Sequence, residues 1–430
     1  MTIILLLLAP IIHDSLPNGF DYYLWPDHHL PMVEIRVTTD IGSIYDPEDL
    51  PGLANLTHLM LERGTEDYTY LELLNLIESM GARLSVNVGR EQITVKARCL
   101  SKHLSSMLRI IGCLIRKPTF PEDEIERLKT EIIGRIRAEN DDPFAIGINV
   151  FYDLIYEGHP LAHSPIGTEK SVMGIEREEV VTFYQDHYLP NISVIALCGD
   201  LEVEPVVEIL KSTFGDWKRN QIKEIPSPPT LDSTRIRAVT RDLSQAYIFF
   251  GNTGMARNDS SYLAARLGNF VLGGSGLTSR LSNRIREEGG LAYIAFSRLR
   301  SGKVDHPFVA LVQTKVDSAP SSVKMLIEEV DRIRREGIDS AEYERTQSYY
   351  SGHFPIAYDT YRERADLLVY IHRFRLGIDY LDRFPEMIGS ISLKDVNEAL
   401  SAVIDRNFGL VVVGPIDSTT LRSWLPDKPK

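Results

Sequence analysis

Two stretches, one late in each half of the chain, repeat the same order of features. Residues 175–184 and 391–400 each have the spacing of apolar residues that is typical of an amphipathic helix. Residues 191–200 and 407–416 follow them as short apolar segments with a glycine near the end, which is typical of a buried strand. A helix–strand pattern that returns after about half the chain indicates an internal duplication.

A second pair of matching segments supports the duplication. Glu124–Arg127 and Glu342–Arg345 share the pattern Glu-x-Glu-Arg, and each opens a long helical stretch. At 430 residues the chain exceeds the usual size of a single core, so more than one domain is expected. Segment 223–230 is rich in proline, which is disfavoured in helix interiors and central strands. We therefore predict an N-terminal domain at 1–222, a linker at 223–230 and a C-terminal domain at 231–430.

Each predicted half mixes strands with long helices. This mixture predicts an α+β fold, built as two homologous α/β sandwiches in which helices cover a mixed sheet, with the two domains paired like a clamshell. The expected strands are Met32–Thr38, Ile93–Arg98 and Ser193–Leu197, and the expected helices are Tyr70–Met80, Leu104–Arg116 and Glu122–Glu139.

The composition excludes several classes of partner and site. A formal net charge of -13 disfavours nucleic acid or an anionic membrane as the main partner. The three cysteines lack C-x-x-C spacing, so neither a disulfide framework nor a structural zinc site is expected. No apolar run reaches the ~20 residues of a membrane span. The apolar start, 1–10, has no preceding basic residue, so we interpret it as a buried first strand and expect a cytoplasmic protein; a truncated signal and a periplasmic protein remain the alternative.

The helical segment Gly52–Thr65 carries a specific resemblance. Its frame, with Gly-Leu-Ala at the start and Gly-Thr at the end, resembles the zinc helix of the insulinase-like family, which includes pitrilysin and the mitochondrial processing peptidase. That family carries the motif His-x-x-Glu-His on this helix. With the flanks aligned, the first His position is Asn55, the Glu position is His58 and the second His position is Leu59. The resemblance extends over nearly the whole chain, including the segments 16–19, 42–47, 183–191 and 245–251.

The resemblance also locates the third zinc ligand of the family. Catalytic zinc takes three protein ligands and a water, and a nearby carboxylate accepts the proton of that water. The family places its third ligand, a Glu, on a later helix; counted back from Asp141–Pro143, that position falls on Gly134 or Arg135. Glycine has no ligating side chain, and a guanidinium repels a divalent cation. We therefore expect no cofactor in this chain and zinc in a partner subunit.

Histidines elsewhere offer no better metal site. His58 and Glu62 lie four residues apart on one helix face, so a shifted site is the remaining alternative, but two ligands without a third make a weak site. The other histidines lie in a predicted turn, or in a loop that the family has in subunits with and without metal: His28, His29, His159 and His163.

The second half carries a further family signature. Residues 272–281 are glycine-rich but lack the Gly-Lys-Ser/Thr of a phosphate-binding loop, and they run into the segment 283–293. Together they are similar to the stretch in which the family places an Arg and, seven residues on, a Tyr that reach the substrate. These residues are Arg286 and Tyr293. A guanidinium and a phenol hydroxyl can stabilise the oxyanion that forms when a peptide carbonyl is attacked, and one such donor contributes ~3 kcal/mol.

The resemblance implies a metal-free subunit of a heterodimeric zinc peptidase. The expected partner is a homologous subunit with an intact His-x-x-Glu-His, and the expected substrate is a peptide or unfolded polypeptide. Arg286 and Tyr293 would act in trans on a substrate bound at the zinc of the partner. The alternative is a non-enzymatic structural or peptide-holding core subunit of a larger complex.

Overall fold

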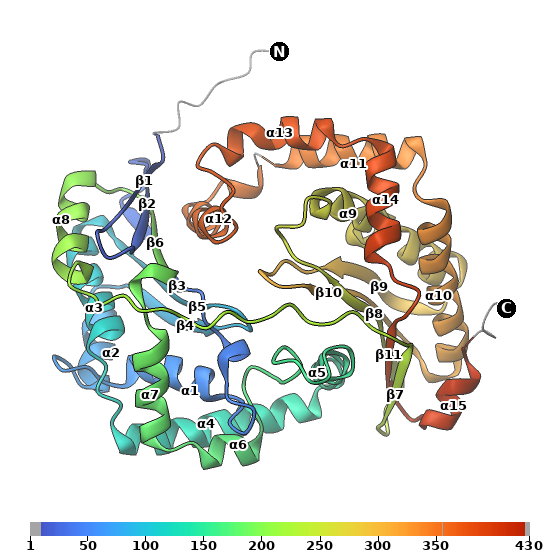
Figure 1. Cartoon of the computed structure of the whole chain (residues 1–430), viewed down its shortest axis with the longest axis horizontal. Coiled ribbons are helices and arrows are strands. Elements are labelled where there is room, and N and C mark those ends of the chain that lie inside the picture. Colours follow the sequence, from blue (N-terminus) through green and yellow to red (C-terminus); the bar gives the residue numbers. More distant parts are fainter. Residues whose placement is uncertain (1–9, 355, 426–430) are drawn as a thin grey trace. The chain divides into compact units, whose positions relative to one another are not determined.

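The computed structural model describes residues 10–354 and 356–425 (Figure 1). These residues form two compact units. Described residues up to 136, together with 164–224 and 356–381, make the first unit, and 137–163, 225–354 and 382–425 make the second. The first strand predicted over 1–10 lies outside the described residues, apart from its last position.

The first unit is built on a six-stranded sheet with the order β1-β2-β6-β3-β5-β4. β2 pairs with β6 in parallel, and every other neighbouring pair is antiparallel. The strands are β1 (Ile12–Ser15), β2 (Asp21–Pro26), β3 (Met32–Thr39), β4 (Arg83–Val88), β5 (Ile93–Leu100) and β6 (Ser193–Gly199).

Helices with one apolar side pack on this sheet and form its core. In α3, for example, Met107, Leu108 and Ile111 are fully buried, as the helical spacing of apolar residues requires. The helices of the first unit are α1 (Leu53–Met60), α2 (Tyr70–Ser79), α3 (Leu104–Arg116), α6 (Glu169–Gly174), α7 (Arg177–His187), α8 (Val203–Phe214) and α12 (Tyr361–Arg373). Two further helices, α4 (Glu122–Asp141) and α13 (Tyr380–Ser390), contribute residues to both units.

The second unit has a five-stranded sheet with the order β7-β11-β8-β10-β9. The strands are β7 (Arg235–Thr240), β8 (Gln245–Met255), β9 (Ala292–Leu299), β10 (His306–Lys315) and β11 (Gly409–Gly414). Its helices are α5 (Pro143–Ile155), α9 (Tyr262–Asn269), α10 (Ala319–Glu336), α11 (Ser340–His353), α14 (Leu393–Val403) and α15 (Ser418–Ser423), with π-helical turns η5 (Phe270–Gly274) and η7 (Ser282–Glu288).

The two sheets share one topology. β7 pairs with β11 in parallel, as β2 pairs with β6, and the remaining pairs of the second sheet are antiparallel in the same order as β6-β3-β5-β4. The predicted fold of two mixed sheets covered by helices is therefore confirmed. The strands and helices named from the sequence are also present, with ends that differ by a few residues.

One helix in each unit comes from the other half of the sequence. α5, from the first half, packs on β8 and β11 of the second sheet, whereas α12, from the second half, packs on β3 and β6 of the first. Gly147 of α5 lies against the ring of Phe249, where an added Cβ atom would come within 2.0 Å of a ring carbon. The predicted domain boundary at 223–230 stays a prediction. The compact units do not correspond to the two halves of the sequence, because each unit contains a helix from the other half.

α12 buries apolar side chains and is also joined to its unit by ion pairs. The Arg364 guanidinium donates to Asp27 Oδ2 at 2.6 Å, and Asp366 accepts from the buried Arg36 at 2.6 Å. At the end of the helix, Arg373 donates to Asp40 at 2.8 Å. A second donor of the same guanidinium bonds Glu91, also at 2.8 Å.

Candidate functional site

The helix with the zinc-helix frame is buried and firmly anchored at its N-terminus. Both carboxylate oxygens of Asp46 accept backbone N–H bonds at 2.7 Å, from Gly52 and Ala54. Gly52 has a φ of +99°, and an added Cβ atom there would lie 2.9 Å from the carbonyl oxygen of Ile166. Only glycine adopts this conformation without strain, so the Gly that opens the motif has a backbone role.

The positions that we predict to match the family's zinc motif are filled by buried or half-buried side chains. Asn55 and His58 are buried, and Leu59 is half-buried. His58 Nδ1 lies 2.9 Å from the Tyr188 hydroxyl oxygen. Burial lowers the pKa of His58 to about 3, and the nearby backbone of Thr94 offsets this only in part. At neutral pH the imidazole is therefore uncharged. A group with so low a pKa does not take up a proton at neutral pH, so His58 cannot replace the carboxylate that accepts a proton in the family's mechanism.

Glu62 and Arg63 follow α1 directly and differ in their environments. Glu62 is largely withdrawn from solvent, and burial raises its pKa to about 7. Arg63 remains charged, and its guanidinium donates to Glu131 of α4 at 2.7 Å. It also lies 3.5 Å from a carboxylate oxygen of Glu124 and stacks 4.5 Å from the ring centroid of Tyr70. Arg63 thus links this segment to α4.

The two candidate positions for the third ligand point away from the core. Gly134 and Arg135 are both exposed on α4, and a Cβ atom added at Gly134 would meet nothing within 4 Å. Within the described residues no group of three or more His, Cys, Asp or Glu side chains is arranged to hold a metal ion. The donor set at the family positions therefore does not fit zinc, and His58 with Glu62 does not form a replacement site.

His28, His29 and His159 each make a hydrogen bond within the chain. His28 and His29 lie in the turn between β2 and β3, where they bond the carboxylates of Asp200 at 2.7 Å and Asp27 at 2.5 Å. His159 is buried, and its Nε2 lies 2.8 Å from the carbonyl oxygen of Pro226. Burial lowers the pKa of His159, so this ring is uncharged at neutral pH. His163 is half-buried in the same loop.

The second signature presents its two polar side chains to solvent. The Arg286 side chain, on η7, is 37% exposed, and its Nη1 lies 3.7 Å from the Glu287 carboxylate. Tyr293 is 59% exposed. It lies at a bulge in the edge strand β9, because Ile294 pairs with Gln313 whereas Ala292 pairs with Thr314. A bulge redirects side chains at a sheet edge, and here it contributes to the exposure of Tyr293.

The backbone around this signature contains a feature that the sequence reasoning missed. η5 and η7, on either side of the glycine-rich loop, are π-helical turns, which are rare and often found at functional sites. Gly273 in η5 lies so close to β9 that a Cβ atom would approach the backbone nitrogen of Ser297 to 2.1 Å. The adjacent glycines 273 and 274 were a signal of close backbone approach, but nothing in the sequence specified a π-helix.

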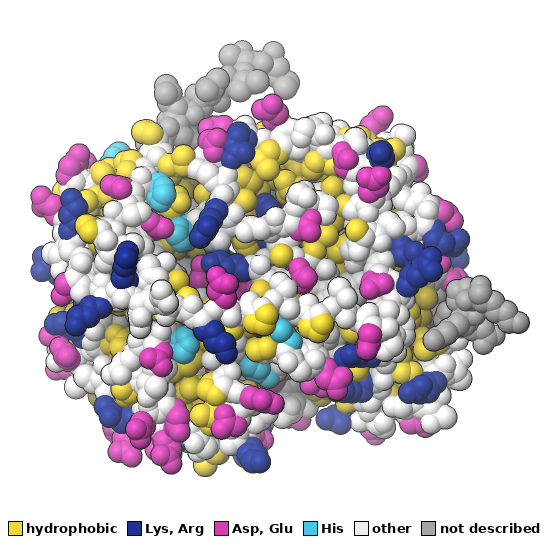
Figure 2. Space-filling view, viewed as in Figure 1, with side chains coloured by type: hydrophobic (Ala, Val, Ile, Leu, Met, Phe, Trp, Pro, Cys, Tyr) yellow, Lys and Arg dark blue, Asp and Glu magenta, His cyan; other side chains and the backbone are white. Residues whose placement is uncertain are grey.

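The surface shows mixed charge. On the face seen in Figure 2, lysine and arginine side chains are distributed among aspartates and glutamates. Among the described residues, no helix has the length and apolar character needed to cross a membrane.

Comparison with known proteins identifies relatives along most of the chain. The family profile described as Insulinase (Peptidase family M16) matches residues 26–169, and the profile described as Peptidase M16 inactive domain matches residues 174–350. A Helicobacter pylori protein described as a non-peptidase homolog, YmxG, is 24% identical over 390 residues, which is 90% of each chain. A Rickettsia bellii protein described as an uncharacterized zinc protease is 21% identical and covers 93% of this chain and 97% of its own length. The structure of a peptidase M16 inactive domain from Pseudomonas fluorescens superposes with a TM-score of 0.89 at 23% identity, over 94% of this chain and 98% of that one.

Proposed function

The chain belongs to the insulinase family, peptidase family M16, and on that premise we propose that it is the metal-free subunit of a two-chain zinc peptidase, inactive by itself. One subunit of such an enzyme supplies the zinc helix. The other supplies groups that bind the substrate and stabilise the transition state. The present chain takes the second role.

The observation that carries this proposal is the contrast between its two signatures. Around Asn55 and His58 the polar machinery has been replaced by buried core side chains, so this half cannot activate a water molecule. Around Arg286 and Tyr293 the polar groups are retained and exposed. A protein that served only as a scaffold would gain no stability from an exposed arginine and an exposed tyrosine at a sheet edge.

The chemistry of the retained pair suits a peptide substrate. Hydrolysis of a peptide bond at the zinc site of such a partner would develop negative charge on the carbonyl oxygen. The hydroxyl of Tyr293 can donate a hydrogen bond to that oxygen, and the guanidinium of Arg286 can bind peptide carbonyl groups through its planar donors. The substrate is therefore a peptide or an unfolded polypeptide, and the partner is a homologous chain with an intact His-x-x-Glu-His. A cytoplasmic location stays a prediction.

The proposal is tested by reconstitution with a zinc-bearing homologue that co-purifies with the native protein. The chain alone is expected to bind far less than one zinc per molecule and to cleave nothing, whereas the mixture cleaves peptides. Arg286→Ala should lower the turnover of the mixture by about 100-fold without loss of assembly, because it removes a transition-state donor. Arg300→Ala is the matched control, since Arg300 is an exposed arginine directly after β9, the strand that follows η7.

Two results would contradict the proposal. Chelator-sensitive cleavage by the lone chain would show that it carries its own metal site. A fully active mixture with Arg286→Ala would instead favour the structural, peptide-holding alternative, in which Arg286 and Tyr293 are dispensable.

A further inference from the structure

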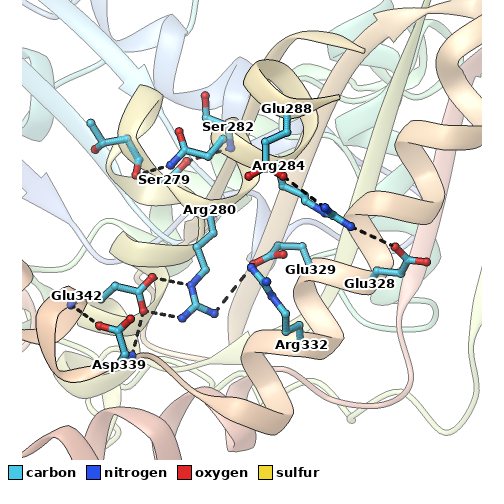
Figure 3. Close-up of polar contacts among 12 residues, drawn as sticks. Ser279, Arg280, Ser282, Arg284, Glu288, Glu328, Glu329, Arg332, Asp339 and Glu342 are labelled. Atoms are coloured by element: carbon cyan, nitrogen blue, oxygen red, sulfur yellow. Dashed lines mark hydrogen bonds and ion pairs between the residues drawn. The ribbon is translucent and has the colours of Figure 1, made fainter. Parts of the chain in front are cut away.

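The arginine of the Ser279–Leu281 stretch is half-buried and held by carboxylates, unlike Arg286. The Arg280 side chain is only 16% exposed. Its Nε donates to Glu342 Oε1 at 2.7 Å and its Nη2 donates to Glu342 Oε2 at 2.5 Å, so the pair is bidentate (Figure 3). Its Nη1 lies 4.0 Å from Glu329, which is 2% exposed. Bidentate pairs of this kind fix orientation as well as distance.

The carboxylate partners of Arg280 are themselves fixed. Glu342 forms a capping box with Asp339 at the start of α11: its carboxylate accepts from the Asp339 N–H at 3.0 Å, and its own N–H donates to Asp339 at 2.8 Å. Glu329, on α10, accepts from Arg332 at 2.7 Å. Arg280, two residues before η7, thus ties this part of the chain to the first turn of α11 and to the middle of α10.

The other end of the segment is also tied to α10. The Leu291 carbonyl oxygen, just before β9, accepts a hydrogen bond of 2.6 Å from the Thr314 hydroxyl. Thr314 lies 3.2 Å from the hydroxyl of Ser322, a residue of α10, and both side chains are fully buried. Between these two contacts the chain passes through η7. The turn that follows η7 is closed by a backbone hydrogen bond, in which the Leu291 N–H donates to the Ile285 carbonyl oxygen at 3.0 Å.

We infer that Arg280 is a positioning residue that holds the segment 281–291, and with it Arg286, through its bidentate bond to Glu342. A π-helical turn is rare and mostly occurs as a single turn inside other structure, so we expect η7 to depend on the contacts that fix its ends. The effect on cleavage rests on the proposed function, whereas the effect on the order of the segment does not.

A neighbouring arginine offers a matched control. Arg284 lies on η7 itself, is 41% exposed, and pairs only loosely, at 3.3 Å with Glu288 and at 4.0 Å with Glu328 (Figure 3). Exposed pairs of this kind contribute little, so removal of the Arg284 side chain should leave the segment as it is.

Hydrogen exchange of the full-length chain tests the positioning role directly. In Arg280→Met, the amides of residues 286–291 should exchange at least tenfold faster than in the unchanged chain, whereas those of β11 keep their protection. Arg284→Met should leave the exchange of residues 286–291 and of β11 unchanged. Glu342→Gln, which weakens the same bond from the other side, and Arg280→Lys, which keeps the charge but loses the planar fork, should give intermediate increases. Protection of 286–291 within twofold of the unchanged chain in a folded Arg280→Met protein would overturn the inference.

Cleavage by the reconstituted mixture then shows whether an ordered segment 281–291 affects the reaction by positioning Arg286. Arg280→Met should lower kcat with little change in KM, and it should have no further effect when Arg286→Ala is already present. Full additivity of the two changes would overturn the link to Arg286. If Arg286→Ala alone leaves cleavage unchanged, the proposed function fails, and the exchange measurement still decides whether Arg280 holds the segment.

Discussion

The Nδ1 atom of His58 lies 2.9 Å from the hydroxyl oxygen of Tyr188, and both side chains are buried. This pair makes the residue at the family's catalytic glutamate position a part of the core. A general base must reach a water molecule and must take up a proton at working pH. His58 does neither, because it is enclosed and its pKa is lowered to about 3.

The first prediction concerns pH and the pair His58 and Glu62. Between pH 3 and 6.5 the unfolded chain binds a proton at His58 that the folded chain does not. The free energy of unfolding therefore decreases as pH falls through this range. Between pH 4.5 and 7 the folded chain retains a proton on Glu62 that the unfolded chain releases, so this contribution is lost as pH rises. The two effects oppose each other between pH 4.5 and 6.5.

Glu62→Gln removes one of these effects. Relative to the unchanged chain, its free energy of unfolding should increase with pH by up to about 1.4 kcal/mol per pH unit between pH 4.5 and 7. Urea unfolding at several pH values measures this difference. Glu66→Gln, at a carboxylate that is 65% exposed, is the control and should show no such trend. A pH-independent difference for Glu62→Gln would show that Glu62 is ionised in the folded chain.

The second prediction concerns the Tyr293 hydroxyl. Tyr293→Phe should lower kcat of the reconstituted mixture by about 10- to 100-fold with KM nearly unchanged, because the hydroxyl would act only on the charge of the transition state. The control is Tyr349→Phe, which removes a hydroxyl from a tyrosine on α11 that is 44% exposed. Steady-state kinetics on one peptide separates the two constants; equal losses in both variants would contradict the specific role.

The third prediction uses two helical glycines. Gly147→Ala on α5 should destabilise the chain by about 1–3 kcal/mol, because the new methyl group would overlap the buried ring of Phe249. Gly134→Ala on α4 should stabilise it by up to about 1 kcal/mol, since the site is open and alanine favours a helix. Denaturant unfolding gives both values. A stabilising Gly147→Ala would show that α5 does not pack as closely on β8 as described here.

The fourth prediction concerns the exchanged helix α12. Arg373→Met should reduce the free energy of unfolding by about 3 kcal/mol or more, because it removes the positive charge from beside the buried carboxylates of Asp40 and Glu91. Arg362→Met, at an exposed arginine of the same helix, should cost less than about 0.5 kcal/mol. Similar values for the two variants would mean that the ion pairs do not hold α12 in place.

The candidate site could be predicted in part from the sequence. The frame of Gly52–Thr65 predicts that Asn55, His58 and Leu59 occupy the zinc-motif positions, because flanking glycines mark backbone positions that side-chain changes do not move. The bond from His58 to Tyr188 could not be predicted, since these residues lie 130 positions apart and only the packing of α1 on α7 brings the two regions together. Likewise, the sequence offered no sign that Arg280 would pair with Glu342 while Arg286 remained exposed.

The sequence by itself determined the two mixed sheets and the loss of the metal ligands, because both follow from residue type and from periodicity along the chain. Only the tertiary structure decided which sheet each helix covers. The apolar residues of α5 and the apolar and charged residues of α12 determine which side of each helix is buried. They do not determine which of the two sheets that side packs on. That choice depends on complementary partners distant in the sequence, such as Phe249 for Gly147 and Asp40 for Arg373, and these partners meet only when the chain is folded.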